Sequence, residues 1–320
     1  MACLQRVLAR HQKNIARLAK RCLSSSTNHD GFKVRQLHEK ESASLANSQT
    51  TEGSRLTNED LKLFHRVDPE GFFVALDNAG DIVGTIGAVR WTDRLGFIGF
   101  CHAGEQAKDQ IKGVEEALWL AAMEHLGDRN VGIEVDASEA EKCGQLGFQE
   151  AWRSGCYKGV GVSLLPEAQS TKIVRRITEM PFSKVAYFDE DLFDLQRMKF
   201  LYRWANIETP AGHSYALSEN ENVMGYGVMR QLNLSKKYRI APLYCQHTAV
   251  AQVLLLALLH NIPDQTVYID SPLSNPSFTR ILTTDLRMEQ IGERVRMYTK
   301  GDPSMPLQKM FGTFGSDLGS

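Results

Sequence analysis

The same order of local patterns occurs twice along this chain. Alternating apolar residues at 71–90 surround the turn residues Asn-Ala-Gly-Asp, and residues 214–230 surround a polar stretch in the same way. Each pattern predicts a β-hairpin. Because each hairpin is followed by a further strand, a helix and another strand, we interpret the chain as two copies of one mixed α/β unit.

The expected fold class is therefore α/β, with a mixed α+β sheet in each of two tandem units. Each unit is expected to be a mostly antiparallel sheet flanked by helices. The units span 31–162 and 172–320 and join near 164–170, and each reaches a turn, at 157–159 and 298–301. The other expected strands are 33–37, 95–101, 131–135, 238–244 and 267–270, and the expected helices begin at Thr57 and cover 112–126, 139–146, 248–259 and 275–285.

Composition excludes several classes of protein. Of 320 residues, 37 are basic and 38 acidic, a net charge of −1 that gives no global electrostatic case for nucleic acid. No apolar run is long enough to span a bilayer, so no membrane partner is expected. The six cysteines form no C-x-x-C pair and no cluster at zinc spacing, so we expect no disulfide framework and no metal.

The first 29 residues differ from the average. They contain six basic residues at helical spacing opposite an apolar face, and no acid occurs before Asp30. A basic amphipathic segment followed by Ser24–Thr27 is typical of a mitochondrial transit peptide, which predicts the mitochondrial matrix. The alternative is a solvated basic helix or disordered leader in a cytoplasmic protein.

A glycine-bearing turn at 110–113 precedes the helix expected over 112–126. A helix start exposes unpaired N–H groups and the positive end of the macrodipole, and such an end binds phosphate. Together with Leu146-Gly147-Phe148 further on, this stretch resembles the acetyl-CoA site of the GNAT superfamily of N-acetyltransferases. Glu115 stands where that motif has a second glycine or alanine.

Both halves resemble GNAT domains, and the whole resembles the two-domain YitH-type acetyltransferases abundant in nematodes. The stretches of sequence that carry this resemblance are 223–230, 238–244, Asp270 with Asn275, and 296–298. The resemblance implies an acetyl-CoA or other acyl-CoA co-substrate in the first half, because no glycine precedes the helix at 248. The implied cofactor-binding residues are Cys101, His102, Lys108, Gln110, Lys112, Gly113, Val114 and Ala117.

Acyl transfer to an amine needs a base, a donor for the thioester oxygen and an acid for the leaving thiolate. Glu134 and Asp136 share one face of a strand and are candidate bases, or else solvated carboxylates. His102 is a further candidate base. The tyrosine acid of the superfamily is absent, and Cys143 stands near its position, either as acid or as a small buried thiol. Tyr157 is another candidate acid or a structural residue.

In the second half, Arg239, Tyr244, Asp270 and Asn275 are candidate acceptor-binding residues at strand ends. Arg239 and Asp270 can instead form a structural ion pair. The sequence thus predicts an acyl-CoA-dependent N-acyltransferase acting on a small amine or amino acid. Two alternatives stay open: a catalytically weak acyl-CoA-binding or regulatory protein, and a relative of the mitochondrial glycine N-acyltransferases.

Overall fold

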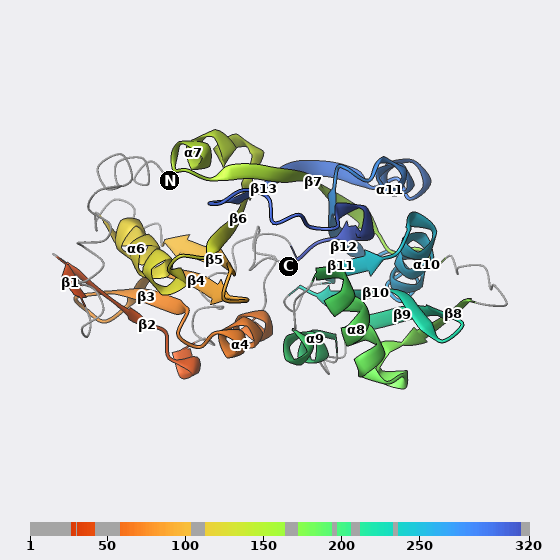
Figure 1. Ribbon diagram of the computed structural model, residues 1–320, viewed down its shortest axis with the longest axis horizontal. Helices are drawn as coiled ribbons and strands as arrows, with labels where there is room; N and C mark the ends of the chain where they lie inside the picture. The colour runs from red at the N-terminus through yellow and green to blue at the C-terminus, as the bar shows by residue number, and fades with distance from the viewer. Residues whose placement is uncertain are drawn as a thin grey trace. The chain divides into compact units, whose positions relative to one another are not determined.

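The computed structural model describes residues 27–29, 31–41, 58–103, 113–163, 172–193, 197–205, 212–232 and 236–314. The chain divides into two compact units. Unit 1 is built from the chain up to Ala151 and from Met297–Asp302, and unit 2 from Trp152–Arg296 and Pro303–Gly315. Each unit is a mixed α/β structure, as the repeated pattern predicts, and each is described by itself below (Figure 1).

The sheet of unit 1 follows the order β1-β2-β3-β4-β5-β6. Its neighbours pair antiparallel except β5 and β6, which are parallel. Helix α6 lies across the sheet against β3 and β4 (Figure 1). The elements are β1 (Thr27–His29), β2 (Phe32–Gln36), η1 (Glu39–Glu41), α4 (Asn58–Val67), β3 (Phe72–Asp77), β4 (Ile82–Arg90), β5 (Leu95–Ala103), α6 (Val114–Leu126), β6 (Asn130–Asp136), η2 (Ala137–Glu139) and α7 (Ala140–Gln145).

The predicted hairpin of unit 1 forms because its turn chemistry is local. The Asp77 carboxylate accepts hydrogen bonds from the backbone N–H groups of Ala79 and Asp81, both at 2.9 Å, and Gly80 takes a positive φ of 91°. The strands on either side bury their apolar residues. Phe72 and Phe100 lie in the core with their ring centroids 5.8 Å apart. Turn and core therefore select the same register.

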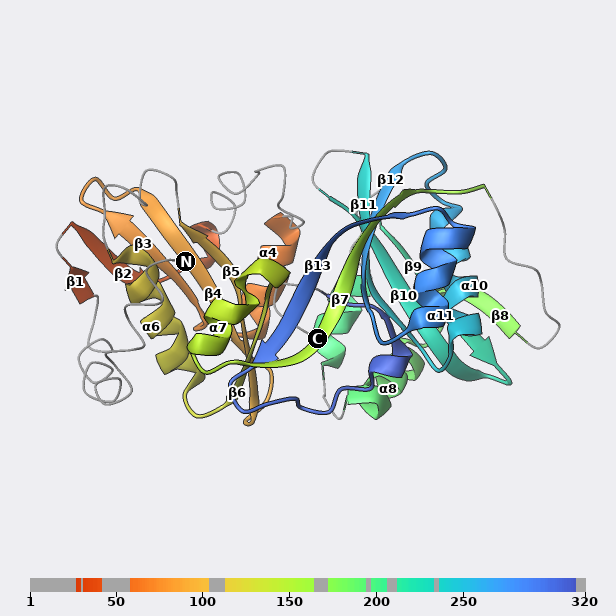
Figure 2. The same ribbon diagram turned by 90° about the horizontal axis from the view of Figure 1, so that it is seen from above.

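The sheet of unit 2 follows the order β13-β7-β12-β11-β10-β9-β8, with β14 paired to β11. Strands β11 and β12 are parallel, and β7 and β13 run as long neighbouring strands (Figure 2). The elements are β7 (Gln149–Val160), β8 (Lys172–Arg176), η3 (Ile177–Glu179), α8 (Phe182–Phe193), α9 (Met198–Ala205), β9 (His213–Glu219), β10 (Asn222–Gln231), β11 (Lys237–Cys245), α10 (Thr248–Leu259), β12 (Thr266–Pro272), α11 (Pro276–Arg280), η4 (Ile281–Asp285), β13 (Glu289–Tyr298), η5 (Leu307–Lys309) and β14 (Met310–Gly312).

The core of unit 2 is organised around α10. This helix is apolar on nearly every side, and its residues Val250, Leu254 and Leu258 are at most 1% exposed. A helix of that kind needs cover on all its faces. The hairpin between β9 and β10 turns at Asn220 and Glu221, both with positive φ, which is the geometry of a tight two-residue hairpin loop.

One sequence expectation is wrong. Residues 157–159 form no turn, because they lie inside β7 and pair with β12, Tyr157 opposite Ile269. Glycines at 155 and 159 suggest a turn by composition, but within the strand they leave space for neighbouring side chains. A Cβ on Gly155, for example, would lie 2.6 Å from the Tyr157 hydroxyl. Sequence reasoning did not anticipate helices α8 and α9; α8 packs beside β10, and α9 packs against α8 (Figure 1).

Each unit contains a strand segment from the other half of the sequence. Trp152–Val160 of β7 belongs to unit 2, and Met297–Asp302 belongs to unit 1. There, Thr299 exchanges hydrogen bonds with the backbone of Val131, and the Asn130 side chain bonds Lys300 N–H and Gly301 C=O at 2.8 and 2.9 Å. The predicted turn after Tyr298 is thus hydrogen-bonded to residues from the first half of the chain.

Candidate functional site

The start of α6 in unit 1 has the expected geometry. Gly113 caps the helix with φ 98° and ψ −1°, in the left-handed region that a side chain disfavours. Its carbonyl accepts the first helical hydrogen bond, from Ala117 N–H at 2.9 Å. The N–H groups of the first turn have no carbonyl partner within the helix, so this end can receive an anion.

The side chains around this helix start differ in how deeply they are buried. Val114 and Ala117 are buried in the core of unit 1, so a ligand at the helix start would meet their backbone and not their side chains. Glu115 and Glu116 are half-buried in the first turn. Three other expected contacts, Lys108, Gln110 and Lys112, lie outside the described residues, as does the side chain of His102.

Strand β5 leads toward that helix start and carries a β-bulge. The register with β4 shifts between Thr85 and Gly87, so Phe100 and Cys101 together oppose one residue, Ile86. Phe100 has φ 51°, which re-aims the strand beyond it. Cys101 follows with its side chain exposed. A bulge releases a backbone N–H from the ladder, so β5 can offer a hydrogen-bond donor in the same unit as the start of α6.

The candidate bases and acid of unit 1 differ in exposure. Glu134 is buried in β6, whereas Asp136 is exposed at its end. Cys143 is buried in α7, and burial raises the pKa of its thiol, with Glu139 adding to the effect. A thiol of raised pKa holds its proton at neutral pH. It is also a weaker acid than an ordinary thiol, so the raised pKa by itself does not favour Cys143 as a proton donor. Of the two carboxylates, Glu134 is the one shielded from water.

The Leu146-Gly147-Phe148 motif packs the end of α7 against α6. The Cys143 carbonyl accepts hydrogen bonds from the N–H groups of Leu146 and Phe148, and Gly147 takes φ 92°. The Phe148 ring then meets Trp119 of α6 edge-on, with centroids 6.0 Å apart. This places Cys143 on the element that follows β6, beside the helix that begins at Gly113.

Tyr157 belongs to a different unit from these residues. It is fully buried in the core of unit 2, where burial raises the pKa of its hydroxyl. The structure therefore groups Glu134, Asp136 and Cys143 with the α6 start in unit 1, and it does not group Tyr157 with them.

The four expected acceptor-binding residues are all buried in unit 2, and all contact the segment Met310–Phe314. Arg239 donates to the Phe314 carbonyl and lies 3.8 Å from the Asp270 carboxylate. The Asp270 carbonyl accepts from Thr313 N–H. Tyr244 pairs with Met310, and the Asn275 amide donates to the Met310 carbonyl.

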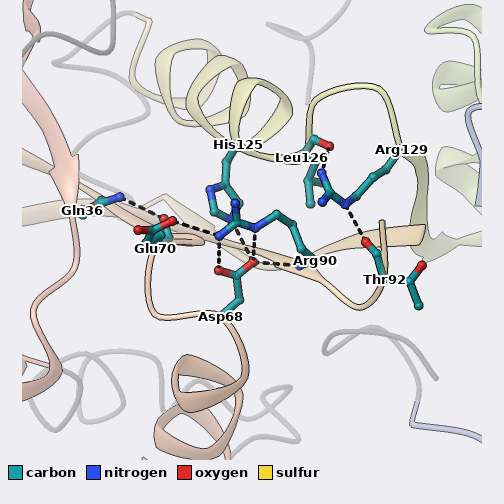
Figure 3. Close-up of polar contacts among 8 residues, drawn as sticks. All are labelled: Gln36, Asp68, Glu70, Arg90, Thr92, His125, Leu126 and Arg129. Carbon is teal, nitrogen blue, oxygen red and sulfur yellow. Dashed lines mark hydrogen bonds and ion pairs between the residues drawn. The ribbon is translucent and has the colours of Figure 1, made fainter. Parts of the chain in front are cut away.

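Two buried charged clusters were not anticipated. In unit 1, Asp68 accepts hydrogen bonds from His125 Nε2 at 2.8 Å and from Arg90 Nε and Nη2 at 3.0 Å each (Figure 3). These contacts join the ends of α4, β4 and α6. Arg129 adds a bond to the Leu126 carbonyl (Figure 3). The cluster fixes the end of α6 opposite to Gly113, and its members are too far apart in sequence for a pattern to reveal it.

In unit 2, Asp189 and Arg197 form a fork-to-fork ion pair with N–O distances of 2.8 and 2.9 Å, and each side chain is 1% exposed. Tyr226 donates to the same carboxylate at 2.5 Å. The Arg197 guanidinium lies over the Phe193 ring, 4.7 Å from its centroid. This cluster fills the space between α8 and β10.

The described helices include none long and apolar enough to cross a membrane. Within the same described ranges, no group of three or more His, Cys, Asp or Glu side chains is placed to hold a metal ion.

Comparison with known proteins agrees with this architecture. Over 92% of the chain, the fold matches a putative acetyltransferase from Pyrococcus horikoshii (98% of that chain, TM-score 0.72, 14% identity). It also matches a tandem GNAT protein from the clavulanic acid biosynthesis pathway over 83% of this chain and 98% of that one (TM-score 0.60, 13% identity). The fold is thus a tandem GNAT fold.

Residues 185–312 match the family model described as "Acetyltransferase (GNAT) domain". The matched stretch lies in the second half of the chain. In sequence, the chain is 26% identical over 262 residues to "Holothin acyltransferase" of Pseudoalteromonas sp. (strain SANK 73390), covering 81% of this chain and 85% of that protein.

Proposed function

We propose that this protein is an acyl-CoA-dependent N-acyltransferase acting on a small amine or amino acid, with acyl-CoA bound at unit 1. The observation that carries the proposal is the β5–α6 junction. A strand with a bulge at Phe100–Cys101 precedes a helix whose N-cap residue, Gly113, is left-handed. The chain's similarity to a protein named as an acyltransferase, over most of both lengths, supports it.

The α6 start would hold the pyrophosphate of the co-substrate. Backbone N–H groups and the helix dipole supply the attraction, and a glycine at the cap lets the phosphate oxygens approach. Lys108, Gln110 and Lys112 are the proposed side-chain contacts. The β5 bulge would direct the Cys101 or His102 N–H to the thioester oxygen, where charge develops during attack by the amine.

Proton transfers fall to the residues of β6 and α7. In the proposed reaction Glu134, or Asp136 through water, takes the proton from the attacking amine. The amine nitrogen bonds to the thioester carbon, and the carbon–sulfur bond breaks. In this scheme Cys143 gives its proton to the departing thiolate. Its thiol is protonated at neutral pH, but because burial raises its pKa, the transfer is uphill and Cys143 is a weak acid for this step.

The second candidate function is an acyl-CoA-binding or regulatory protein with little turnover. Glu115 favours it, because a carboxylate in the first turn of α6 repels phosphate if it turns toward the ligand. Cys143 favours it too, since a thiol replaces the tyrosine acid of the resembled superfamily. The finer resemblance to YitH-type proteins, and that to glycine N-acyltransferases, both remain predictions.

The decisive experiment is a thiol-release assay with acetyl-CoA and a panel of small amines, run beside a binding measurement. The proposal expects amine-dependent CoA release by the wild type. It expects Glu134→Gln to lower the rate roughly 100-fold, as loss of a general base does, while acetyl-CoA affinity stays unchanged. Binding without release by the wild type across the panel would favour the second candidate.

We also propose that residues 1–29 are a mitochondrial transit peptide. Most of this stretch lies outside the described residues, but Thr27–His29 form β1 and pair with β2. Import into isolated mitochondria followed by N-terminal sequencing tests this. Absence of uptake would favour the cytoplasmic alternative.

A further inference from the structure

The parallel strands β11 and β12 of unit 2 diverge along their length, and we call the opening between two such strands a fork. They pair from Lys237 with Thr266 as far as Ile240 with Ile269, and then β14 runs between them. On one side Leu243 pairs with Gly312; on the other, the Asp270 carbonyl accepts from Thr313 N–H at 2.9 Å. Where two strands diverge, their facing backbone N–H and C=O groups no longer pair with each other, and an extended chain can hydrogen-bond to them. Here residues 310–314 of the same chain do so.

Side chains from several elements of unit 2 contact this segment, Met310–Phe314. The Asn275 amide donates both its hydrogens, to the carbonyls of Leu307 and Met310 at 2.8 Å each. Phe311 meets Phe278 with ring centroids 5.0 Å apart, and Phe314 meets Trp204 at 5.1 Å. All of Met310–Phe314 is buried.

Gly312 allows the segment to enter. A Cβ at this position would lie 3.1 Å from Leu243 Cβ on β11 and 3.3 Å from Ile269 Cδ1 on β12. The fork is thus filled to van der Waals contact at its centre, and no further extended ligand fits there without moving β14.

Unit 1 has the corresponding fork without such an occupant among its described residues. There β5 and β6 pair only from Leu95 to Phe97, and no third described strand pairs with β5 beyond that point on the β6 side. The strand before each fork carries a bulge: Phe100–Cys101 oppose Ile86, and Ala241–Pro242 oppose Val228. The second bulge residue carries an N–H in unit 1, but in unit 2 it is a proline, which has none.

We infer that the Met310–Phe314 segment is a built-in occupant of the unit 2 ligand groove, so unit 2 binds a segment of its own chain and takes no acyl-CoA. This rests on the proposed function in one respect, that an acyl-CoA is the ligand a GNAT groove would otherwise receive. The expected acceptor residues Arg239, Asp270 and Asn275 are, on this view, receptors for the segment.

Native mass spectrometry of the full chain with saturating acetyl-CoA tests the inference. One acetyl-CoA per chain is expected, together with unchanged amide exchange of residues 310–314. Two per chain, or faster exchange of that segment when acetyl-CoA is added, would overturn it. No binding at all, with slow exchange at 310–314, would contradict the proposed function and leave the occupied groove supported.

Displacing the segment gives a second test. Gly312→Val should clash with Leu243 and Ile269 and raise amide exchange at residues 311–314 at least tenfold, while α10 keeps its protection. Equal acceleration throughout unit 2 would mean that β14 is an inseparable part of the fold and would contradict the inference.

Discussion

The two units share one fold and differ at the place where strand gives way to helix. In unit 1 the helix begins at a left-handed glycine, Gly113; in unit 2 it begins after His247, which is extended with φ −160°. The unit 2 fork is filled by Met310–Phe314. Under the proposed function, this difference would confine acyl-CoA to unit 1, because only there do a glycine cap and a fork that no other described segment fills leave room for a phosphate and an extended ligand.

The strongest way to break this comparison is to place a carboxylate at each helix cap. Gly113→Glu should weaken acetyl-CoA binding roughly 1000-fold, since a negative charge then faces phosphate at several kcal/mol. His247→Glu, the matched change in unit 2, should leave affinity unaltered. Isothermal titration calorimetry measures both.

Gly113→Asn separates charge from backbone strain, because asparagine tolerates the left-handed region. It should keep most of the affinity. Equal losses in Gly113→Glu and His247→Glu would show that both units bind the ligand.

A second difference lies in the buried ion pairs. Asp189→Ala leaves the Arg197 guanidinium buried without its carboxylate, and removing one partner of such a pair lowers stability by about 3–5 kcal/mol. Asp68→Ala in unit 1 should lower it by roughly 1–2 kcal/mol, because water reaches Arg90, whose side chain is 34% exposed. Urea unfolding compares the two; a larger loss for Asp68→Ala would reverse the ranking.

The same cluster predicts a pH dependence confined to unit 1. Burial alone would raise the pKa of Asp68, but hydrogen bonds from His125 and Arg90 outweigh it and hold that pKa well below its usual range. A depressed folded-state pKa adds stability above the unfolded value of about 4, on the order of 2 kcal/mol, and this is lost as pH falls below that value.

Urea unfolding of the wild type between pH 6 and pH 3 should record the first part of that loss, which continues down to the folded-state pKa. Asp68→Asn removes the titrating carboxyl group, so its contribution to the pH dependence of the free energy of unfolding should disappear. An identical pH slope in wild type and variant would contradict the assignment.

The smallest expected effect concerns the two buried thiols. Cys143→Ala should lower kcat about tenfold, less than the roughly 100-fold or more that loss of a general acid or base typically brings, because a thiol of raised pKa is a weak acid. Acetyl-CoA affinity should stay unchanged. Cys245→Ala, a buried cysteine on β11, should leave kcat unaltered. Steady-state kinetics decides, and an unaltered kcat in Cys143→Ala would assign that thiol to packing alone.

Local patterns predicted the elements well, because their causes are local. The helix expected over 248–259 is α10, residue for residue, and the helix start at Gly113 and both hairpins are found where turn residues and alternation place them. The tandem fold followed from their order alone.

The rest depends on contacts between residues distant in sequence. Nothing local indicates that Met297–Asp302 completes unit 1, or that Met310–Phe314 enters the fork between β11 and β12. The polar residues Arg239, Asp270 and Asn275 were recognised as a group but assigned to a ligand, since sequence does not reveal which part of the chain they contact. Asp68 and His125 meet only through the fold, 57 positions apart.

Hydrogen exchange measured by mass spectrometry, with and without acetyl-CoA, tests the central claim most directly. The account predicts slower exchange at the start of α6 and at the end of β5 on ligand addition, with α10, β11 and β14 unchanged. Protection at the start of α10 and the end of β11 instead, with α6 unaffected, would contradict it.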